Sequence, residues 1–275
     1  PSEYEAFRAY AEIYPDACLL LVDTYDTLKS GVPNAIRVFD ELRAAGHEPK
    51  GIRLDSGDLA YLSKKARRML DEAGYPDAII CASGDLDEKL IASLKSQGAK
   101  IDLWGVGTKL ITSSDLPALG GVYKLAALYP AEGGEINKIK LSDNSDKITN
   151  PAFKEVFRIY DKESGKAEAD LICLKGEEID EREPLTIFHP KDTWKRTTFT
   201  NYTVRRLSRK VIEGGKPVAP SPSLAEVCAY AEREKQSFWD EYKRLDNPHI
   251  YKVDLSEKLY NVKNEMISEI RNKNV

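Results

Sequence analysis

The chain is poor in cysteine and histidine and has no long apolar run. Its 275 residues include four cysteines and three histidines. The cysteines are widely separated, form no CxxC pair and have no histidine at metal-ligand spacing, which argues against a thiolate metal site. Cys18 and Cys81 lie inside apolar runs, where a reduced cysteine behaves as a small hydrophobic residue.

No apolar stretch approaches the ~18 to 20 residues that a membrane-spanning helix requires. The net charge of −4 at pH 7 provides no overall positive field that would attract nucleic acid or an anionic membrane, so any phosphate binding must be local. With 41% hydrophobic residues, the chain can bury a sizeable core in one large domain or two smaller ones. We expect a cytoplasmic enzyme with small-molecule substrates, without nucleic-acid or membrane partners.

An apolar run that ends in a short polar cluster occurs four times in the first 110 residues. The four segments are CLLLVDTYD (18–26), GIRLDSGD (51–58), AIICASGD (78–85) and DLWGVGT (102–108). Helical periodicity follows each run, and the strand starts recur every ~20 to 33 residues, as right-handed βαβ crossovers require. Because parallel strands place their carboxyl ends on one face, we expect the four polar clusters to converge on a single site.

Helix signals lie between the expected strands. Pro33 stands at a plausible first helical position, and Asp58 can cap the helix after the second strand. Gly46, Gly74 and Gly98 can end the first three helices. Four βα units are half of a (β/α)8 barrel, which takes ~250 residues, so the sheet is open or further strands lie upstream. We favour the second interpretation, in which the chain begins partway through a fold.

From Gly120 onward the pattern changes to short alternating runs, which predict an antiparallel sheet. These runs are GGVYKLAALY (120–129), KIKLSD (138–143), KEVFRIYD (154–161) and EADLICLK (168–175). A connector rich in proline and glycine, 213–222, precedes a long amphipathic helix expected over 223–245, and a last helix is expected over 256–272. The long helix should face the core through Leu224, Val227, Cys228, Ala231 and Phe238.

These patterns divide the chain into four portions. They are the end of an upstream segment (1–17), βα units carrying the site (18–119), a β-rich portion (120–222) and C-terminal helices (223–275).

Gly105, Gly107 and Thr108 form a candidate phosphate-binding loop. Glycine lets backbone N–H groups approach an anion, and Thr108 offers a hydroxyl at the start of a helix, where the helix dipole favours negative charge. The spacing matches neither a P-loop nor a Rossmann fingerprint. The signal is weak alone, because a tight turn without a ligand would explain it about as well.

A Ser-Gly-Asp sequence follows a strand twice, and Arg53 and Asp55 alternate along one of those strands. The repeats are Ser56-Gly57-Asp58 and Ser83-Gly84-Asp85. Strand alternation sends Arg53 and Asp55 to the same side. This pair suits a phosphorylated sugar, since arginine binds anions and aspartate accepts from ribose hydroxyls, but it could also be a buried ion pair that only stabilises the interior. Asp23 and Asp26 could orient a histidine or hold a hydrated Mg²⁺.

Together, five segments resemble the successive motifs of the nicotinate phosphoribosyltransferase family. They are LLLVDTYDTLKSGVPNAI, GIRLDSGDL, SGDLDEKLIASL, IDLWGVGTKLITS and LGGVYKLAAL. The resemblance is nearly unbroken over 19–128 and continues more loosely through KIKLSDNSDKITNPAFKEVFRIYD to the carboxyl end.

The resemblance implies an α/β fold of the type II phosphoribosyltransferase kind. This is an irregular α/β barrel, incomplete in this chain, with an antiparallel β-rich sandwich portion and C-terminal helices, acting as a homodimer. The implied reaction transfers the phosphoribosyl group of 5-phosphoribosyl 1-pyrophosphate (PRPP) to nicotinate and releases pyrophosphate, in NAD biosynthesis. It uses Mg²⁺ and is coupled to ATP hydrolysis through a phosphorylated histidine.

The resemblance also implies roles for individual residues. Asp23 would orient the histidine, Arg53 would hold the base and nearby anions, and Asp55 would meet the ribose hydroxyls. Asp26 and Asp55 are the candidate metal ligands. The expected substrate-binding residues are Ser56, Gly57, Ser83, Gly84, Asp85, Gly105, Gly107 and Thr108.

The family's phosphorylated histidine has no counterpart here. It belongs to a segment just before the first strand, and residues 1–17 contain no histidine. We interpret His47, His189 and His249 as structural, because none stands at the carboxyl end of an expected strand. The chain is therefore expected to be the carboxyl-terminal part of the enzyme and inactive alone.

Three alternatives remain. Nicotinamide or quinolinate could replace nicotinate as the base. A barrel aldolase or isomerase acting on a sugar phosphate would need a strand-end lysine or a carboxylate base, and Lys109 and Lys124 are the nearby lysines. The basic stretch 194–210, which has interleaved aromatic residues, could contact nucleic acid or an acidic partner, although most charge runs are solvated faces.

Overall fold

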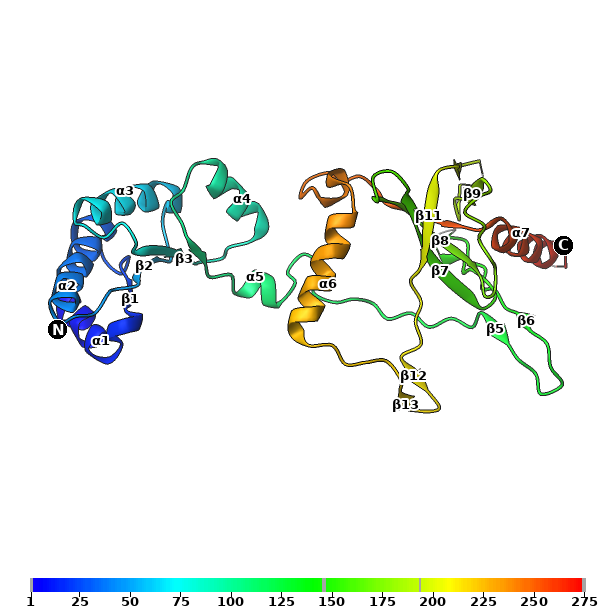
Figure 1. Cartoon of the computed structure of the whole chain (residues 1–275), viewed down its shortest axis with the longest axis horizontal. Coiled ribbons are helices and arrows are strands. Elements are labelled where there is room, and N and C mark those ends of the chain that lie inside the picture. Colours follow the sequence, from blue (N-terminus) through cyan, green and yellow to red (C-terminus); the bar gives the residue numbers. More distant parts are fainter. Residues whose placement is uncertain (1, 145–146, 193, 274–275) are drawn as a thin grey trace. The chain divides into compact units, whose positions relative to one another are not determined.

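The computed structural model describes residues 2–144, 147–192 and 194–273. It divides the chain into two compact units, Pro1–Gly120 and Gly121–Val275, whose elements are labelled in Figure 1. Within the described residues, no helix combines the length and the apolar character needed to cross a membrane.

The first unit is built on a four-stranded parallel sheet with strand order β1-β2-β3-β4. Its strands are β1 (Leu19–Leu21), β2 (Gly51–Leu54), β3 (Ile79–Ala82) and β4 (Leu103–Trp104). All three strand pairs are parallel, which confirms the expected succession of βα units. The strands are shorter than the apolar runs, because the polar cluster that ends each run leaves the hydrogen-bonded ladder.

Helices precede, connect and follow these strands along the chain. They are α1 (Glu3–Ile13), α2 (Val32–Ala44), α3 (Leu59–Glu72), α4 (Glu88–Ser96) and α5 (Thr108–Ile111), with a 3₁₀-helix at Pro15–Ala17 and a π-helix at Thr27–Gly31. Asp58 caps α3 as expected, because its Oδ1 accepts the Tyr61 N–H at 2.9 Å. After β3, α4 begins at Glu88, and Asp87 caps it by accepting the Leu90 N–H.

The core of the first unit lies between the sheet and its helices. Ile52 and Ile80 from the sheet are fully buried, as are Phe39 on α2 and Leu70 on α3. Cys18 belongs to this core, and burial raises the pKa of its thiol to about 11, so the thiolate is disfavoured at neutral pH. The apolar interpretation of this cysteine is confirmed.

The second unit contains a six-stranded mixed sheet with strand order β10-β9-β14-β8-β7-β11. Its strands are β7 (Lys154–Asp161), β8 (Ala167–Leu174), β9 (Leu185–Phe188), β10 (Arg196–Phe199), β11 (Tyr202–Arg206) and β14 (Lys252–Leu255). The neighbours β7 and β8 are antiparallel as expected, but β14 pairs in parallel with β8. The antiparallel prediction is confirmed for the pairs within 120–222, and the parallel neighbour β14 is a strand that was not predicted. The fold class is therefore α/β with mixed sheets.

Two small hairpins complete the strands of the second unit. They are β5 (Ala127–Leu128) with β6 (Ile136–Asn137), and β12 (Ile212–Glu213) with β13 (Lys216–Pro217). The run 138–143 forms no strand in its described residues, and the run 120–129 contributes only two strand residues. Both were expected to be full strands.

The long helix predicted over 223–245 is shorter and faces differently than expected. The helix α6 (Leu224–Ser237) ends where Phe238 takes an extended conformation, and a 3₁₀-helix follows at Asp240–Lys243. None of the residues of α6 is buried, and Leu224 is 78% exposed. The helix is instead tied to the sheet by a polar contact, because Glu234 pairs with Arg158 on β7. The prediction that its apolar stripe packs into the core is wrong.

The last helix, α7 (Glu257–Lys273), packs on the sheet of the second unit as expected. Leu259 is fully buried, and the Tyr260 ring stacks on Phe188 with 4.9 Å between ring centroids. The buried Lys263 Nζ donates to Asn150 Oδ1 and to the Pro190 carbonyl, so its ammonium group is solvated by protein oxygens.

Candidate functional site

The carboxyl ends of β1 and β2 are joined by Asp23. Its Oδ2 accepts the Asp55 backbone N–H at 2.8 Å and the Ser56 hydroxyl at 2.6 Å. The hydrogen bonds form because parallel pairing sets Leu21 opposite Arg53, so that the residues leaving both strands run side by side. One carboxylate therefore fixes the turn that follows the neighbouring strand.

Arg53 and Asp55 point to the same side of β2, as alternation predicted. Arg53 Nη2 lies 2.8 Å from Asp55 Oδ1, and the two side chains are 45% and 44% exposed. The pair is half open to solvent, which does not match the alternative of a buried, purely structural ion pair. Both groups are accessible to a ligand.

Ser83, at the end of β3, completes the contact between strand ends. Its hydroxyl accepts Arg53 Nε–H at 2.8 Å and donates to Asp55 Oδ1. The hydrogen bond from Ser83, followed by that from Arg53, holds the pKa of Asp55 below its usual value. Asp55 therefore carries its negative charge throughout the neutral range.

Close approach requires glycine at Gly84 and leaves little room for a side chain at Gly105. A Cβ added at Gly84, whose φ is +92°, would lie 2.2 Å from the Asp55 carbonyl oxygen. A Cβ at Gly105 would lie 3.2 Å from Ser83 Cβ, and the Gly105 N–H donates to the Ala82 carbonyl. These glycines let the ends of β2, β3 and β4 pack against one another.

Other predicted residues stand outside this network. Across the described ranges, no hydrogen bond or ion pair links it with Asp26, Asp85, Gly107 or Thr108. Gly107 is the N-cap residue of the four-residue α5, and a Cβ there would meet nothing within 4 Å, so packing does not demand glycine. Gly57 has a φ of +77° in the turn after β2, where it separates Ser56 from Asp58. The predicted convergence of the four polar clusters is seen at the ends of β1, β2 and β3 and at the start of the loop after β4.

The candidate metal ligands do not form a metal cage. Asp26 Oδ1 caps the π-helix by accepting the N–H groups of Leu28 and Lys29, and these contacts with the Lys29 ammonium hold the pKa of Asp26 below its usual value. Asp55 is occupied by Arg53 and Ser83. In the part of the chain that the structure describes, no group of three or more His, Cys, Asp or Glu side chains could hold a metal ion. Mg²⁺ binding therefore stays a prediction, since this ion commonly needs only one or two carboxylates beside water and substrate phosphates.

A hollow beside Arg53 is lined partly by helix α1, which was not predicted to belong to the site. It has a volume of about 440 Å³ and is bounded by α1 and β1; its lining residues are Ala6, Phe7, Tyr10, Leu19, Leu20, Leu21, Thr24 and Arg53. Residues 1–17 were predicted only as the end of an upstream segment, and the strand that a helix covers cannot be read from the helix sequence alone, so the contribution of α1 was missed.

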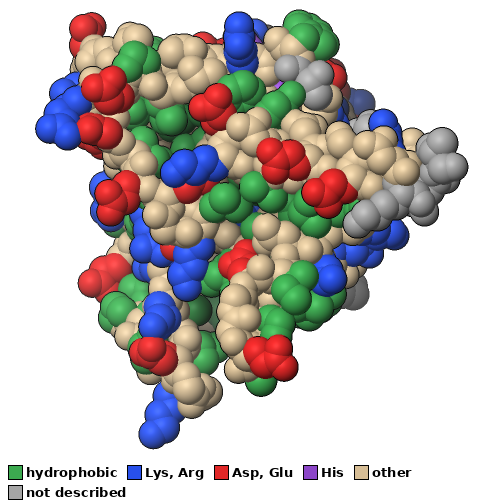
Figure 2. Space-filling view, turned by 90° about the vertical axis from the view of Figure 1, so that its right-hand side faces the viewer, with side chains coloured by type: hydrophobic (Ala, Val, Ile, Leu, Met, Phe, Trp, Pro, Cys, Tyr) green, Lys and Arg blue, Asp and Glu red, His purple; other side chains and the backbone are tan. Residues whose placement is uncertain are grey.

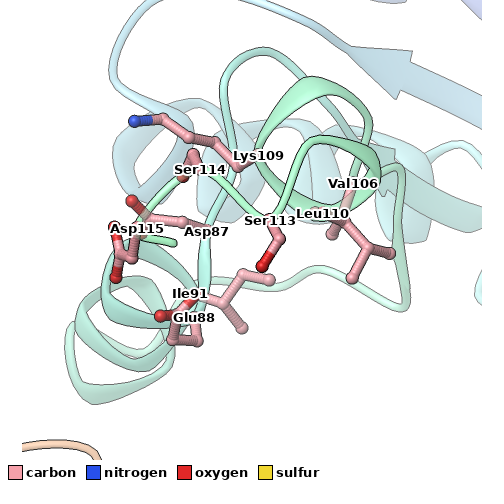
Figure 3. A pocket seen from close by; sticks show the side chains of 9 residues that line it. All are labelled: Asp87, Glu88, Ile91, Val106, Lys109, Leu110, Ser113, Ser114 and Asp115. Atoms are coloured by element: carbon pink, nitrogen blue, oxygen red, sulfur yellow. The ribbon is translucent and has the colours of Figure 1, made fainter. Parts of the chain in front are cut away.

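A second pocket, shown in Figure 3, lies where α4 and α5 meet, with a volume of about 360 Å³. Its lining residues are Asp87, Glu88, Ile91, Val106, Lys109, Leu110, Ser113, Ser114 and Asp115. Val106 and Lys109 flank Gly107 and Thr108, but none of the predicted site residues lines the pocket. Lys109, one of the two lysines considered for aldolase or isomerase chemistry, lines this pocket and has no hydrogen bond or ion pair with Arg53 or Asp55 among the described residues.

The three histidines have local partners. His47 Nδ1 lies 2.8 Å from Asp16 Oδ1 in the first unit. In the second unit, His189 Nδ1 accepts the Asp192 N–H, and the His249 ring packs against Tyr242. These contacts are those expected of structural histidines.

The basic stretch 194–210 is largely neutralised by carboxylates. The ion pairs are Lys195–Asp192, Arg205–Glu234, Arg206–Glu155 and Lys210–Glu213. Figure 2 shows basic and acidic side chains interspersed on the face that it presents. Paired charges of this kind favour an internal role over a phosphate-binding surface.

Solved structures share this architecture. The crystal structure of human nicotinic acid phosphoribosyltransferase superposes with a TM-score of 0.76 at 29% identity, covering 96% of this chain and 50% of that chain. A nicotinate-nucleotide pyrophosphorylase from Pyrococcus furiosus superposes with a TM-score of 0.55 at 20% identity, covering 86% and 51%, a likeness of fold alone. By fold, the chain stands with the type II phosphoribosyltransferases.

The sequence comparisons all find nicotinate phosphoribosyltransferases. Residues 153–263 match the family model of the nicotinate phosphoribosyltransferase C-terminal domain. The chain is 47% identical over 273 residues to nicotinate phosphoribosyltransferase of Bacillus subtilis (strain 168), covering 98% of this chain and 55% of the relative. It is 33% identical over 273 residues to the Homo sapiens enzyme, covering 97% and 50%. The resemblance to the nicotinate phosphoribosyltransferase family is confirmed, and the chain spans about half the length of these curated relatives.

Proposed function

We propose that this chain is part of a nicotinate phosphoribosyltransferase and supplies the groups that hold the ribose of PRPP. The observation that carries the proposal is the hydrogen-bonded network of Asp23, Arg53, Asp55 and Ser83 across three adjacent strand ends. The whole enzyme would transfer the phosphoribosyl group to nicotinate and release pyrophosphate, with coupled ATP hydrolysis, as a step of NAD biosynthesis. The 47% identity to the Bacillus subtilis enzyme supports this assignment.

The chemistry asks for positioning more than for a protein nucleophile. Phosphoribosyl transfer passes through a cationic, oxocarbenium-like centre, so the rate depends on clamping the sugar and placing the base. Asp55 remains ionised and half exposed, which suits an acceptor for ribose hydroxyls. Arg53 supplies a guanidinium group beside it for an anionic oxygen.

The hollow beside Arg53 suits the base. Phe7 and the leucines of β1 give it apolar walls, and Arg53 brings a positive charge to the same space. An aromatic ring that carries a carboxylate, as nicotinate does, would pack against the walls and place its carboxylate at the guanidinium. Nicotinamide has no carboxylate and would lose that ion pair, which favours nicotinate over nicotinamide.

Further features belong to the same proposal. Gly84 with Asp85, and Gly105 with Gly107 and Thr108, would contact the ribose and its 5′-phosphate. We expect this chain to contribute an incomplete irregular barrel and a sandwich portion. The whole protein would be a cytoplasmic homodimer. Mg²⁺ would be held mainly by the pyrophosphate of PRPP, with Asp26 or Asp55 as the candidate protein ligands.

The test is an assay of the natural polypeptide that contains this sequence, with PRPP, ATP, Mg²⁺ and labelled nicotinate. We expect labelled nicotinate mononucleotide and pyrophosphate, with quinolinate and nicotinamide as poor substrates. Asp55→Asn should lower kcat/KM by about 100-fold or more, as for the loss of a charge-stabilising contact in other enzymes. The matched control is Asp77→Asn, at an exposed aspartate outside the network. Equal activity of Asp55→Asn and the unchanged enzyme would place the site elsewhere.

A further inference from the structure

We propose that Ser83 is a positioning residue that fixes Arg53 and Asp55 together and leaves one atom of each for the substrate. The inference rests on the proposed function for the identity of the substrate, but its geometry can be tested without any ligand. It assigns Ser83 a role different from the direct substrate contact expected from the sequence.

The hydroxyl of Ser83 is hydrogen-bonded to both neighbours and is almost shielded from solvent. It accepts Arg53 Nε–H at 2.8 Å and donates its proton to Asp55 Oδ1, and the residue is only 6% exposed. A serine hydroxyl has one proton to donate, so its donor function is used up in this arrangement. Ser83 therefore acts through its two neighbours, because a sugar or phosphate could not reach it without breaking these bonds.

The backbone around Ser83 prevents it from moving away. The Ser83 N–H donates to the Leu54 carbonyl at 2.9 Å, which continues the pairing of β2 and β3 by one residue. On one side of Ser83, Gly84 lies so close to the Asp55 carbonyl that no side chain fits there. Across from it, Gly105 lies beside Ser83 Cβ. The serine is thus held from three strands.

The arrangement determines which atoms remain open. Arg53 uses Nε on Ser83 and Nη2 on Asp55, so its Nη1 is the guanidinium nitrogen without a partner among the described residues. Asp55 Oδ1 receives both the Ser83 hydroxyl and Arg53 Nη2, while Oδ2 receives no hydrogen bond in the same ranges. A ligand that donates a hydroxyl to Oδ2 and accepts at Nη1 fits this pair. A hydroxyl next to an anionic group is the chemistry of a ribose phosphate.

The test compares Ser83→Ala with Ser63→Ala in the natural polypeptide that contains this sequence. Ser63 is a matched control because it is also buried, accepts the Lys100 N–H at 3.1 Å and donates to the Ala60 carbonyl, but lies on α3 outside the network. The first readout is hydrogen exchange of Arg53 Nε–H by NMR. We expect exchange to accelerate about tenfold or more in Ser83→Ala and to remain unchanged in Ser63→Ala, since only the first removes its acceptor.

The second readout is calorimetric titration with PRPP. Ser83→Ala should raise Kd about tenfold, the equivalent of one hydrogen bond to a charged group, while Ser63→Ala leaves Kd unchanged. Unchanged Arg53 Nε–H exchange in Ser83→Ala, or unchanged PRPP affinity while Asp55→Asn loses binding, would overturn the positioning role and leave the proposed function standing. If Asp55→Asn also binds PRPP normally, the proposed function of the network fails.

Discussion

Each unit contains an arginine paired with an aspartate, and the two pairs differ in almost every other respect. Arg53 and Asp55 in the first unit are about half exposed and meet through one nitrogen. In the second unit, Arg158 Nε and Nη2 bind both carboxylate oxygens of Asp170, and each side chain is only 14% exposed. The same two residue types thus form an open pair in one unit and a closed pair in the other.

The surroundings explain the difference. Arg158 also pairs with Glu234 and lies over the Phe238 ring at 4.7 Å, while Asp170 accepts the Tyr251 hydroxyl at 3.0 Å. These partners occupy the guanidinium and the carboxylate, so the closed pair has no atoms left for a ligand. The hydrogen bond to Asp170 raises the pKa of Arg158 above its usual value. The closed pair ties β7, β8 and α6 together. An ion pair is structural when all of its hydrogen-bonding atoms have protein partners, and it can bind a ligand when some of these atoms are free.

The largest expected effect is on the closed pair. Arg158→Ala should lower the free energy of unfolding of the second unit by about 3 to 5 kcal/mol, because it leaves the Asp170 charge buried without its partner. Chemical denaturation followed by tryptophan fluorescence measures this change. Arg182→Ala is the control, since the Arg182–Asp180 pair has an arginine that is 88% exposed, and should change stability by less than about 0.5 kcal/mol. A loss below about 1 kcal/mol for Arg158→Ala would remove the distinction between the pairs.

The next effect concerns the packing that shapes the open pair. Gly84→Ala should destabilise the first unit by about 1 to 3 kcal/mol, because it adds a clash with the Asp55 carbonyl to the strain of a positive φ. Gly98→Ala tests strain alone, since Gly98 has a φ of +74° with nothing within 4 Å of an added Cβ. Thermal unfolding of the two variants should separate the cost of the clash from the cost of the strained backbone. Equal losses would show that the approach of Gly84 to Asp55 costs nothing.

A smaller stability effect is expected at the open pair itself. Arg53→Ala should change the free energy of unfolding by less than about 1 kcal/mol, as for other exposed ion pairs. Its affinity for PRPP should nevertheless fall about 10- to 100-fold, because a charged hydrogen bond to the ligand is lost. Calorimetry and denaturation of one preparation give both numbers. A variant that unfolds easily but binds PRPP normally would reverse the comparison and make the open pair structural.

The smallest effect is the pH response of Asp55. Its pKa is lowered in the folded chain, chiefly by Ser83 and then by Arg53. Its contribution to stability is therefore complete above the unfolded pKa of about 3.9 and is lost as the pH falls through the lower folded pKa. An NMR titration of the carboxyl carbon should show this midpoint move upward in Ser83→Ala. No movement would mean that Ser83 does not hold the carboxylate.

Local pattern was enough for much of the first unit. The periodicity around the four strands, the Asp58 cap and the alternation of Arg53 and Asp55 depend on neighbours in sequence, and the structure confirms each of them. The link from Ser83 to these residues depends on the register of β2 against β3, in which Leu54 pairs with Ala82. A register between separate segments is not contained in either segment alone.

The second unit shows where sequence reasoning failed. The four-residue β14 inserts between β8 and β9, which precede it by many residues, so its pairing is set by tertiary packing. The stripe of α6 had the spacing of a core face, yet Glu234 is the residue that joins the helix to the sheet, through Arg158 and Arg205. Apolar spacing indicates that a face will be covered, but it does not identify the surface that covers it.

The two carboxylate oxygens of Asp23 accept different numbers of hydrogen bonds. Oδ2 supports the turn after β2 through the Asp55 N–H and the Ser56 hydroxyl, whereas Oδ1 has no partner in the described chain. A group that approaches Oδ1 can bind while the turn keeps its shape. A group that binds Oδ2 instead must displace the Asp55 N–H and the Ser56 hydroxyl. Asp23 thus couples ligand binding at the end of β1 to the conformation of the turn after β2.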